Sequence, residues 1–289
     1  MGAIYFFQKL IAPFWDVFFE GVTLLGEQGI AVAVLALTYW CIDKKAGALG
    51  GLSLTCGASL GLMLKNIFQI PRPFDRDPSL RVLRKHTATG YSFPSNHSLT
   101  ASQLFIWLSS YTKRLGWKLL LWLPVVLVPM SRIYLAVHTL EDVLAGVALA
   151  IAVFFLFRWF FAQVEKRPAL LWFSLLPPFM SLATALLTGA TGDALSDPIK
   201  AGALSIGVTV GLWIERKYIC FEAKAPLPVQ IGKAVIGFAG LGLIMVGIKA
   251  VLPYNDLSHV IRYGALGIWF AAGAPAVMKL CFKKKGESK

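Results

Sequence analysis

The chain has 289 residues, of which 57% are hydrophobic and only 15% are charged, and its mean hydropathy is +0.66. Soluble domains average roughly 45–50% apolar and about 25% charged residues, so this composition excludes an ordinary soluble domain and favours membrane spans. The net charge is +13. Most basic residues lie in short connections between apolar runs, where they orient membrane helices, so we expect no nucleic-acid partner.

The first segment, Met1 to Trp15, is expected to form a short interfacial helix that ends near Pro13, with Phe6, Phe7 and Leu10 on its apolar side. Nine apolar stretches follow, each close to the roughly 20 residues that span a bilayer. They lie near residues 18–41, 48–68, 96–111, 118–134, 140–162, 168–188, 199–214, 231–251 and 260–281. The predicted fold is all-α: a polytopic transmembrane bundle of about nine spans.

The connections between these stretches alternate in charge. Acidic residues occupy one set, namely Asp193, Asp197 and Asp256. Basic residues occupy the other set: Lys44 and Lys45; Lys113, Arg114 and Lys118; Lys166 and Arg167; Arg216, Lys217 and Lys224; and Lys283 to Lys285. Positive connections stay in the cytoplasm. We therefore expect a multi-pass protein of the cell membrane with its N-terminus outside and its C-terminus in the cytoplasm.

One connection breaks this rule. The stretch 71–95 is expected to face outward, yet it contains Arg72, Arg76, Arg81, Arg84 and Lys85. An anionic ligand is the simplest reason for such a cluster. Ion pairs with Asp75 and Asp77 are the alternative for some of these cations.

Three groups of residues with chemical potential lie near this outer side. Lys65 precedes Arg72 by seven residues, about two helical turns, so both can reach one anion before Pro71 and Pro73 end the helix. Alternatively, Lys65 reaches the lipid headgroups. Pro94, Ser95, Asn96 and His97 open the third predicted span, where free backbone N–H groups and a hydroxyl favour an anion.

The third group is Ser131 and Arg132, followed by His138 and Asp142. If the fifth helix has begun at His138, the spacing of four places both side chains on one face, where the carboxylate can orient the imidazole. Charge complementarity at the helix start is the alternative for Asp142, and Glu141 can serve it equally well. Together the three groups supply cations, histidines and a carboxylate, the set that phosphoryl transfer requires.

These three blocks, in this order and spacing, resemble the signature motifs of the type 2 phosphatidic acid phosphatase superfamily. The resemblance implies that His138 is a nucleophile forming a phosphohistidine, that Asp142 orients it and that His97 protonates the leaving group. Lys65, Arg72, Ser95, Arg132 and the backbone at Asn96 would bind the phosphoryl oxygens. Asn96 stands where the family usually has glycine. No metal or cofactor is implied.

The motifs cover residues 65–142. We expect a phosphatase core over residues 1–163, with additional C-terminal transmembrane helices over 164–289 packed on it. The predicted function is hydrolysis of a lipid phosphate or diphosphate at the extracytoplasmic face, in contact with membrane lipids. A phosphotransferase using the same histidine, a non-catalytic lipid transporter or binder, and a haloperoxidase are the alternatives. Intact His97, His138 and Asp142 disfavour a mere binder.

Overall fold

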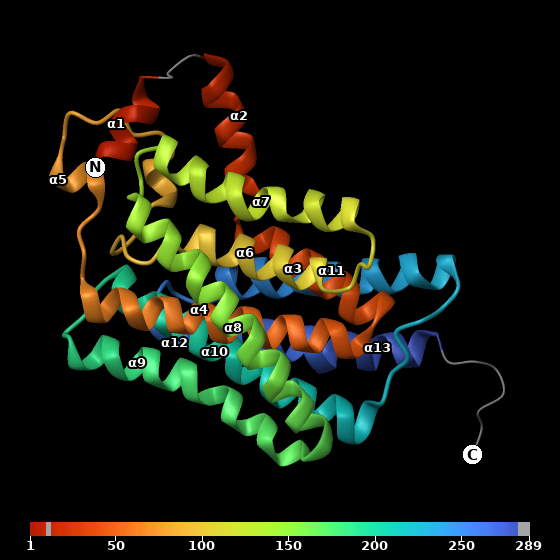
Figure 1. Ribbon diagram of the computed structural model, residues 1–289. Helices are drawn as coiled ribbons and strands as arrows, with labels where there is room; N and C mark the ends of the chain where they lie inside the picture. Colours follow the sequence, from red (N-terminus) through yellow and green to blue (C-terminus); the bar gives the residue numbers. More distant parts are fainter. Residues whose placement is uncertain (10–12, 283–289) are drawn as a thin grey trace, which may run out of the picture.

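The computed structural model describes residues 1–9 and 13–282, and every regular element within these ranges is a helix (Figure 1), as the sequence predicts. Leu10 and the lysines 283–285 lie outside the described residues. In chain order the elements are α1 (Gly2–Gln8), α2 (Pro13–Leu24), α3 (Gln28–Leu37), η1 (Thr38–Ile42), α4 (Lys44–Phe68), α5 (Pro73–Arg76), η2 (Lys85–Thr87), α6 (Asn96–Ser109), α7 (Leu115–Tyr134), α8 (Leu140–Lys166), η3 (Pro168–Leu175), α9 (Leu176–Leu187), α10 (Asp193–Ile214), η4 (Glu215–Ile219), α11 (Leu227–Val251), α12 (Asp256–Ile268), η5 (Trp269–Gly273) and α13 (Ala274–Cys281).

Six helical stretches of the described chain are long and apolar enough to cross a membrane, and a seventh is added if α2 and α3 with η1 form one bent span. The predicted count of nine spans is therefore not confirmed. The six stretches are Lys44–Arg76, Leu115–Tyr134, Leu140–Lys166, Pro168–Leu187, Leu227–Val251 and Asp256–Cys281.

Three predicted spans account for the difference. Helix α6 has 14 residues; at 1.5 Å per residue it measures about 21 Å, short of a hydrocarbon core of about 30 Å. Helix α10 has 22 residues, but Asp197 and Lys200 in its first half lower its apolar character. The predicted stretch 18–41 is interrupted after Leu24, and its two helical parts meet at 45°. The expected N-terminal helix is present as α1, and the next helix begins at Pro13.

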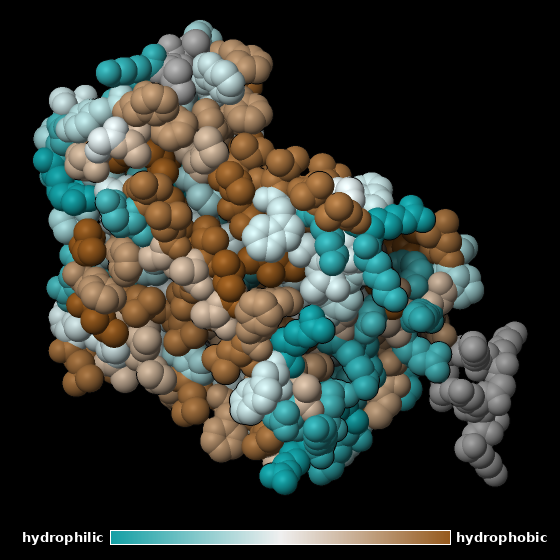
Figure 2. All heavy atoms as spheres, in the orientation of Figure 1, coloured by the Kyte–Doolittle hydropathy of each residue, from teal (hydrophilic) through white to brown (hydrophobic). Residues whose placement is uncertain are grey.

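Apolar side chains cover most of the surface seen in Figure 2, while hydrophilic residues gather most densely at the lower right and also lie along the left edge. Helix α11 belongs to this apolar part, because only 11% of its most apolar 18-residue stretch is buried in the bundle. A soluble protein rarely leaves so large an apolar surface exposed, so this face is suited to lipid.

Helix α4 is the central element and carries the site at its C-terminal end. A Cβ on its Gly57 would lie 2.1 Å from the side chain of Gln103, and one on Gly61 would lie 2.9 Å from Leu99, both on α6. These two glycines therefore let α6 pack closely on α4, as their spacing indicates. On the other side, Gly146 of α8 admits the backbone of Ser95 in the same way, at 2.6 Å. The start of α6 is thus held between α4 and α8.

The core extends across the boundary predicted at residues 163 and 164, which lies within α8. One buried cluster contains Leu52 of α4, Phe157 of α8 and Leu212 of α10. Trp40 donates a hydrogen bond to the carbonyl of Phe270 at 2.9 Å, and the Tyr39 hydroxyl donates to the carbonyl of Ala271 at 2.9 Å. These bonds tie η1 to η5, so the ends of the chain share one packed interior.

Candidate active site

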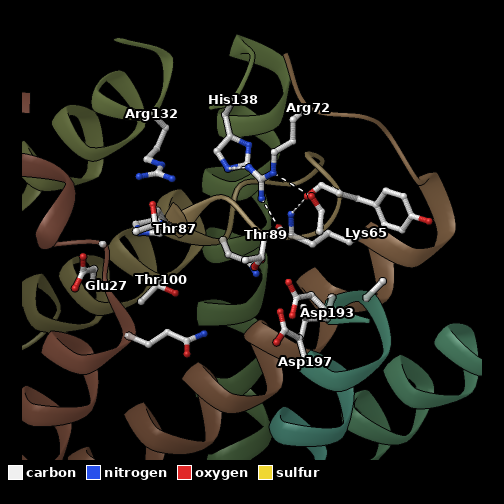
Figure 3. Close-up of a pocket in the computed structure, with 18 of the residues that line it drawn as sticks. Glu27, Lys65, Arg72, Thr87, Thr89, Thr100, Arg132, His138, Asp193 and Asp197 are labelled. Atoms are coloured by element: carbon white, nitrogen blue, oxygen red, sulfur yellow. Dashed lines mark hydrogen bonds between the residues drawn. The ribbon is translucent and has the colours of Figure 1, made fainter. Parts of the chain in front are cut away.

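A pocket of about 430 Å³ lies where α4 ends, between the starts of α6 and α10, the loop after η2 and the start of α3 (Figure 3). It brings together six of the eight residues singled out in the sequence: Lys65, Arg72, Asn96, His97, Arg132 and His138. The other two, Ser95 and Asp142, are buried behind its wall. The three motifs therefore meet in space.

Lys65 and Arg72 are held by carbonyl groups of the segment 89–92, not by a shared helical face. Helix α4 ends at Phe68, and Gln69 follows in the left-handed conformation at φ 49°. The Lys65 ammonium donates to the carbonyls of Tyr91 and Ser92. Arg72 donates from Nε to the carbonyl of Gly90 at 3.0 Å and from Nη2 to the carbonyl of Thr89. Both cations are buried, at 6% and 4% exposure, and are fixed before any ligand binds.

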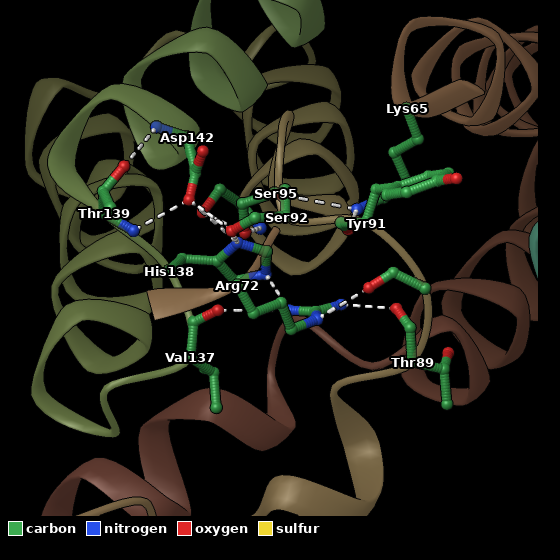
Figure 4. A network of polar contacts seen from close by, with 12 residues as sticks. Lys65, Arg72, Thr89, Tyr91, Ser92, Ser95, Val137, His138, Thr139 and Asp142 are labelled. Atoms are coloured by element: carbon green, nitrogen blue, oxygen red, sulfur yellow. Dashed lines mark hydrogen bonds and ion pairs between the residues drawn. The ribbon is translucent and has the colours of Figure 1, made fainter. Parts of the chain in front are cut away.

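The imidazole of His138 connects the carboxylate of Asp142 with the guanidinium of Arg72 (Figure 4). Its Nδ1 lies 3.5 Å from Asp142 Oδ2, and its Nε2 lies 3.2 Å from Arg72 Nη1. Because arginine only donates, Nε2 must accept, and the proton then belongs on Nδ1 beside the carboxylate. The nitrogen with the free lone pair, Nε2, is therefore the one beside the cations.

Asp142 reaches His138 through a helix cap. Thr139 is the N-cap of α8, so His138 lies before the helix begins. His138 and Asp142 therefore do not meet on one face of a helix, which was the arrangement predicted from their spacing. Asp142 Oδ2 accepts from the Thr139 backbone N–H at 2.8 Å, and the Thr139 hydroxyl accepts from the Asp142 N–H at 3.4 Å. This capping box locks the carboxylate in place.

Burial lowers the pKa of His138 well below its usual value, although the hydrogen-bonding interaction with Asp142 acts in the opposite direction. His138 is 2% exposed, and the nearby Arg72, Lys65 and Arg132 also disfavour its charged form. The ring is therefore neutral at physiological pH, as a nitrogen nucleophile must be.

Arg132, His97 and Asn96 place unpartnered polar atoms at the pocket. Arg132 donates from Nη1 to Thr23 Oγ1 at 2.8 Å. Its Nε and Nη2, together with His97 Nε2 and Asn96 Oδ1, are buried and have no hydrogen-bond partner among the described residues. Buried polar atoms nearly always have partners, so the unpartnered guanidinium donors of Arg132 on the pocket wall suggest a ligand that accepts hydrogen bonds. The φ angle of Asn96 is not positive, so this position does not require the backbone freedom of glycine.

Ser95 has a structural position. Its hydroxyl accepts from the backbone N–H and the hydroxyl of Ser98, at 3.4 and 3.0 Å, and so caps α6. Its own N–H donates to the Asp142 carbonyl at 2.9 Å. Ser131 likewise turns back onto its helix, since its hydroxyl donates to the carbonyl of Val128 at 2.6 Å. Neither hydroxyl lines the pocket.

Two of the loop arginines are paired with acids of other elements. Arg81 lies 2.6 Å from Asp16 of α2, and Arg84 lies 2.7 Å from Glu27. Asp77 instead accepts from the hydroxyls of Tyr5 and Ser79, and these hydrogen bonds lower its pKa. The predicted partners Asp75 and Asp77 are therefore wrong: among the described residues neither forms an ion pair, and Arg81 and Arg84 pair with Asp16 and Glu27 instead. Within the described chain, Arg72 and Arg132 form no ion pair with a carboxylate.

Sequence reasoning missed three residues of this region. The Ser92 hydroxyl donates to Asp142 Oδ2 at 2.6 Å and lies 3.4 Å from His138 Nδ1. Asp193 and Asp197 of α10 line the pocket on the side away from His138 (Figure 3). The two aspartates are four residues apart at the start of a helix, a spacing that places them on one face and is visible in the sequence.

The charges explain what this pocket can bind. Lys65, Arg72 and Arg132 are buried around it, and Asp142 is the one acid that the described part of the chain buries beside His138. Asp193 and Asp197 line the far side of the pocket, and Glu27 pairs with Arg84. An excess of buried positive charge is unfavourable unless an anion joins it. A phosphoryl group fits, because its oxygens accept from several fixed cations while Nε2 of His138 approaches the phosphorus.

Comparisons with known proteins agree with this chemistry. A model of the PAP2 superfamily matches residues 46–166, and a model of the transmembrane extension of PAP2 superfamily phosphatases matches residues 199–285. No solved structure matches the chain.

Three relatives illustrate the range of similar proteins. Sphingosine-1-phosphate phosphatase 2 of Mus musculus is 25% identical over 89% of this chain and 76% of its own length. Dihydrosphingosine 1-phosphate phosphatase YSR3 of Saccharomyces cerevisiae is 31% identical over 53% of this chain and 40% of its own length. Undecaprenyl-diphosphatase BcrC of Bacillus subtilis is 28% identical over 44% of this chain and 66% of its own length.

The two matching models both describe this superfamily, together cover well over half of the chain, and include all three motifs. The second of them describes membrane-spanning helices, in agreement with the long apolar helices of the fold. The chain is therefore a multi-pass integral membrane protein that belongs to the lipid phosphatases of the PAP2 superfamily.

Proposed function

We propose that this protein hydrolyses a lipid phosphate through a phosphohistidine intermediate on His138, with no metal or cofactor. The observation that carries the proposal is the orientation of one imidazole. Its Nδ1 lies beside Asp142 Oδ2 and its Nε2 lies beside Arg72, within a pocket that also contains Lys65 and Arg132.

In the first step, His138 Nε2 attacks phosphorus, the bond from phosphorus to the lipid oxygen breaks, and His97 protonates that oxygen as the lipid alcohol leaves. Lys65, Arg72 and Arg132 neutralise the phosphoryl oxygens, and a phosphate oxygen replaces Nε2 as the acceptor for Arg72. Asp142 stabilises the positive imidazole ring that forms.

In the second step, water attacks the phosphohistidine while His97, now neutral, accepts one of its protons. The bond between phosphorus and Nε2 breaks, inorganic phosphate leaves and His138 returns to its neutral form. The Asn96 backbone at the start of α6 supplies a further N–H to the phosphoryl group, whereas Ser95 supports the site by capping α6.

We propose long-chain amino-alcohol phosphates as the substrate class. The relatives from mouse and yeast are named for sphingoid phosphates, which carry an ammonium group close to the phosphate. Asp193 lines the phosphate pocket and forms no ion pair among the described residues, whereas Asp197 pairs with Lys200 at 2.9 Å. A carboxylate here repels a purely anionic headgroup and attracts a neighbouring ammonium.

The site is proposed to face the extracytoplasmic side of the cell membrane, with residues 1–163 as the catalytic core and 164–289 packed on it. Lys44 and Lys65 lie near opposite ends of α4, a helix of 25 residues or about 37 Å. At the Lys44 end, Lys45 and Arg216 both pair with Glu165, so several basic connections gather there. Positive connections favour the cytoplasm, which supports placing the pocket on the other side.

The test is phosphate release by purified protein in detergent, with a chelator present and His138→Ala as the blank. The panel contains sphingosine 1-phosphate, phosphatidic acid, phosphatidylglycerol phosphate, undecaprenyl diphosphate and glucose 6-phosphate. We expect release above the blank, fastest with sphingosine 1-phosphate. Turnover that survives His138→Ala would refute the phosphohistidine, and no release from any substrate by folded protein would refute hydrolysis.

A further inference from the structure

A second cavity, of about 670 Å³, lies deeper in the bundle and is largely apolar. Its walls come from α3, α4, α10, α11, α12 and η5, and its volume lies within the range of about 300–1,000 Å³ for pockets that bury one small ligand. The apolar lining residues include Val32, Leu54, Leu204, Leu241, Met245 and Leu266. None of the reactions described above uses this cavity.

The cavity continues the phosphate pocket. The residues that line both spaces lie at the starts of α3, α6 and α10 and near the end of α4: Gln28, Gly29, Leu62, Asn96, Thr100 and Asp197. Beyond these shared residues the lining of the second cavity is apolar except for Thr55, Lys200 and Tyr263. The two adjoining spaces therefore offer a charged end, which contains Lys65, Arg72 and Arg132, and a largely apolar end, in the order of the headgroup and chain of a lipid phosphate.

The cavity opens to the side of the bundle between α3 and α11. Trp40 of η1, which follows α3, packs closely on α11, because a Cβ on Gly237 of α11 would lie 2.2 Å from its ring. Further along α11, Gly242 and Met245 line the cavity opposite Gly29 of α3. Met245 is 41% exposed, and a Cβ on Gly242 would meet nothing within 4 Å. A chain in the bilayer can therefore enter without leaving an apolar environment.

We propose that this cleft holds the single hydrocarbon chain of the substrate while its phosphate occupies the pocket beside His138. This inference rests on the proposed function and deepens it. Lipid chains are as apolar as the cleft, so the contact adds little affinity. It supplies position, because a chain held in the cleft directs the phosphate toward His138 Nε2.

The proposal gives the C-terminal helices a role in the reaction. Most of the lining of the cleft beyond its mouth belongs to α10, α11, α12 and η5, which lie in the part matched by the transmembrane-extension model, residues 199–285. A catalytic core without these helices would lack one wall of the cleft. The extension thus selects substrates with one long chain, and diacyl lipids fit poorly.

A pair of glycines on α11 provides the test. Gly242 lines the cleft, whereas Gly247 does not, and a Cβ on either residue meets nothing within 4 Å. Gly242→Phe therefore adds a ring at the cleft from a position where a Cβ meets no neighbour, and Gly247→Phe is its matched control. The substrates are sphinganine 1-phosphate and 2-aminoethyl phosphate, which share the amino and phosphate groups and differ in the chain and its 3-hydroxyl group.

We expect Gly242→Phe to reduce the ratio of kcat/KM for the long substrate to that for the short one by at least about tenfold, because a chain displaced from the cleft no longer positions the phosphate near His138. Gly247→Phe leaves this ratio unchanged. A ratio that Gly242→Phe does not alter, or that both variants alter equally, overturns the chain site while hydrolysis by the wild type still stands.

A labelling measurement separates this proposal from the catalytic one. A long-chain phosphate with a photoreactive diazirine near the end of its chain should label peptides of α10 or α11 in the wild type and not in Gly242→Phe. Labelling confined to the outer faces of α7 and α8 overturns the chain site. Wild-type protein that is labelled as expected but releases no phosphate overturns the proposed function alone.

Discussion

Asp142 has two tasks, and one substitution separates them. Asparagine can keep an oxygen at the place of Oδ2 that accepts from the Thr139 N–H, so the cap of α8 remains, but it removes the negative charge that stabilises the positive ring formed when His138 attacks. We expect Asp142→Asn to lower kcat by a factor on the order of 10³ to 10⁴ with little change in thermal stability. Phosphate release and thermal unfolding in detergent measure the two effects.

Glu141→Gln is the control for this prediction. Glu141 is exposed and lies next to Asp142, and its substitution removes the same charge from the first turn of α8. Its kcat should stay close to that of the wild type. If both variants lose the same activity, Asp142 acts only through the charge at the helix start, and the orienting role is wrong.

The pH profile reports on the same imidazole. Burial lowers the pKa of His138, so the neutral, nucleophilic form persists as the pH falls and is lost only when the pH passes through this lowered value. We calculate kcat/KM from the concentration of the substrate dianion, so that ionisation of the substrate does not contribute to the profile. The pKa of the acid limb should then lie below about 6.5, the ordinary value for histidine. A limb at or above that pH would contradict a buried neutral nucleophile.

Motif spacing predicted the residues that surround the pocket but not how they are held. Lys65 and Arg72 meet because the segment 89–92 turns its carbonyls toward both, and no periodicity encodes that path. Ser92 was missed for the same reason, since its partner Asp142 is 50 residues away. Ser95 was recognised as a helix start, but its hydroxyl is occupied by the cap itself.

At the scale of elements, the sequence predicted helices well and spans less well. An apolar run predicts that a segment avoids water. It does not distinguish a helix buried in the protein from a helix that faces lipid, because both are apolar. Helix α6 is apolar because it is packed between α4 and α8, and 14 residues do not make it a long span. The start of α10 is polar because Asp193 and Asp197 line the pocket.

Helix α10 therefore has a testable role in substrate choice. Asp193→Asn removes the carboxylate proposed to attract the ammonium group, so kcat/KM for sphinganine 1-phosphate should fall about tenfold relative to a long-chain phosphate that lacks the amino group. The comparison is a ratio of two kcat/KM values measured on the same preparation. Asp256→Asn, which removes an acid from the first turn of α12 outside the pocket, is the control. A ratio that Asp193→Asn leaves unchanged contradicts ammonium recognition.

For the molecule as a whole, the distribution of basic residues and the packing both distinguish the pocket end from the opposite end. The helices around the pocket are tied together at the opposite end by Trp40 and Tyr39, which join η1 to η5. Basic residues gather at that end through Lys45 and Arg216 on Glu165. The end with the pocket is itself held by Arg81 on Asp16 and by Arg84 on Glu27, which leaves the side of the bundle as the proposed path for a substrate from the bilayer.

Labelling of two engineered thiols tests this orientation in cells. Ser79 is exposed in the connection that follows α5, on the side of the pocket, and Lys113 is exposed in the connection after α6, near the opposite end. In a background where the exposed Cys220 and Cys281 are replaced by serine, a membrane-impermeant maleimide should label Ser79→Cys in intact cells. Lys113→Cys should be labelled only after permeabilisation, because basic connections stay in the cytoplasm. The reverse result would place the pocket in the cytoplasm, and the cations of the 71–95 connection would then follow the positive-inside rule without needing a phosphate to explain them.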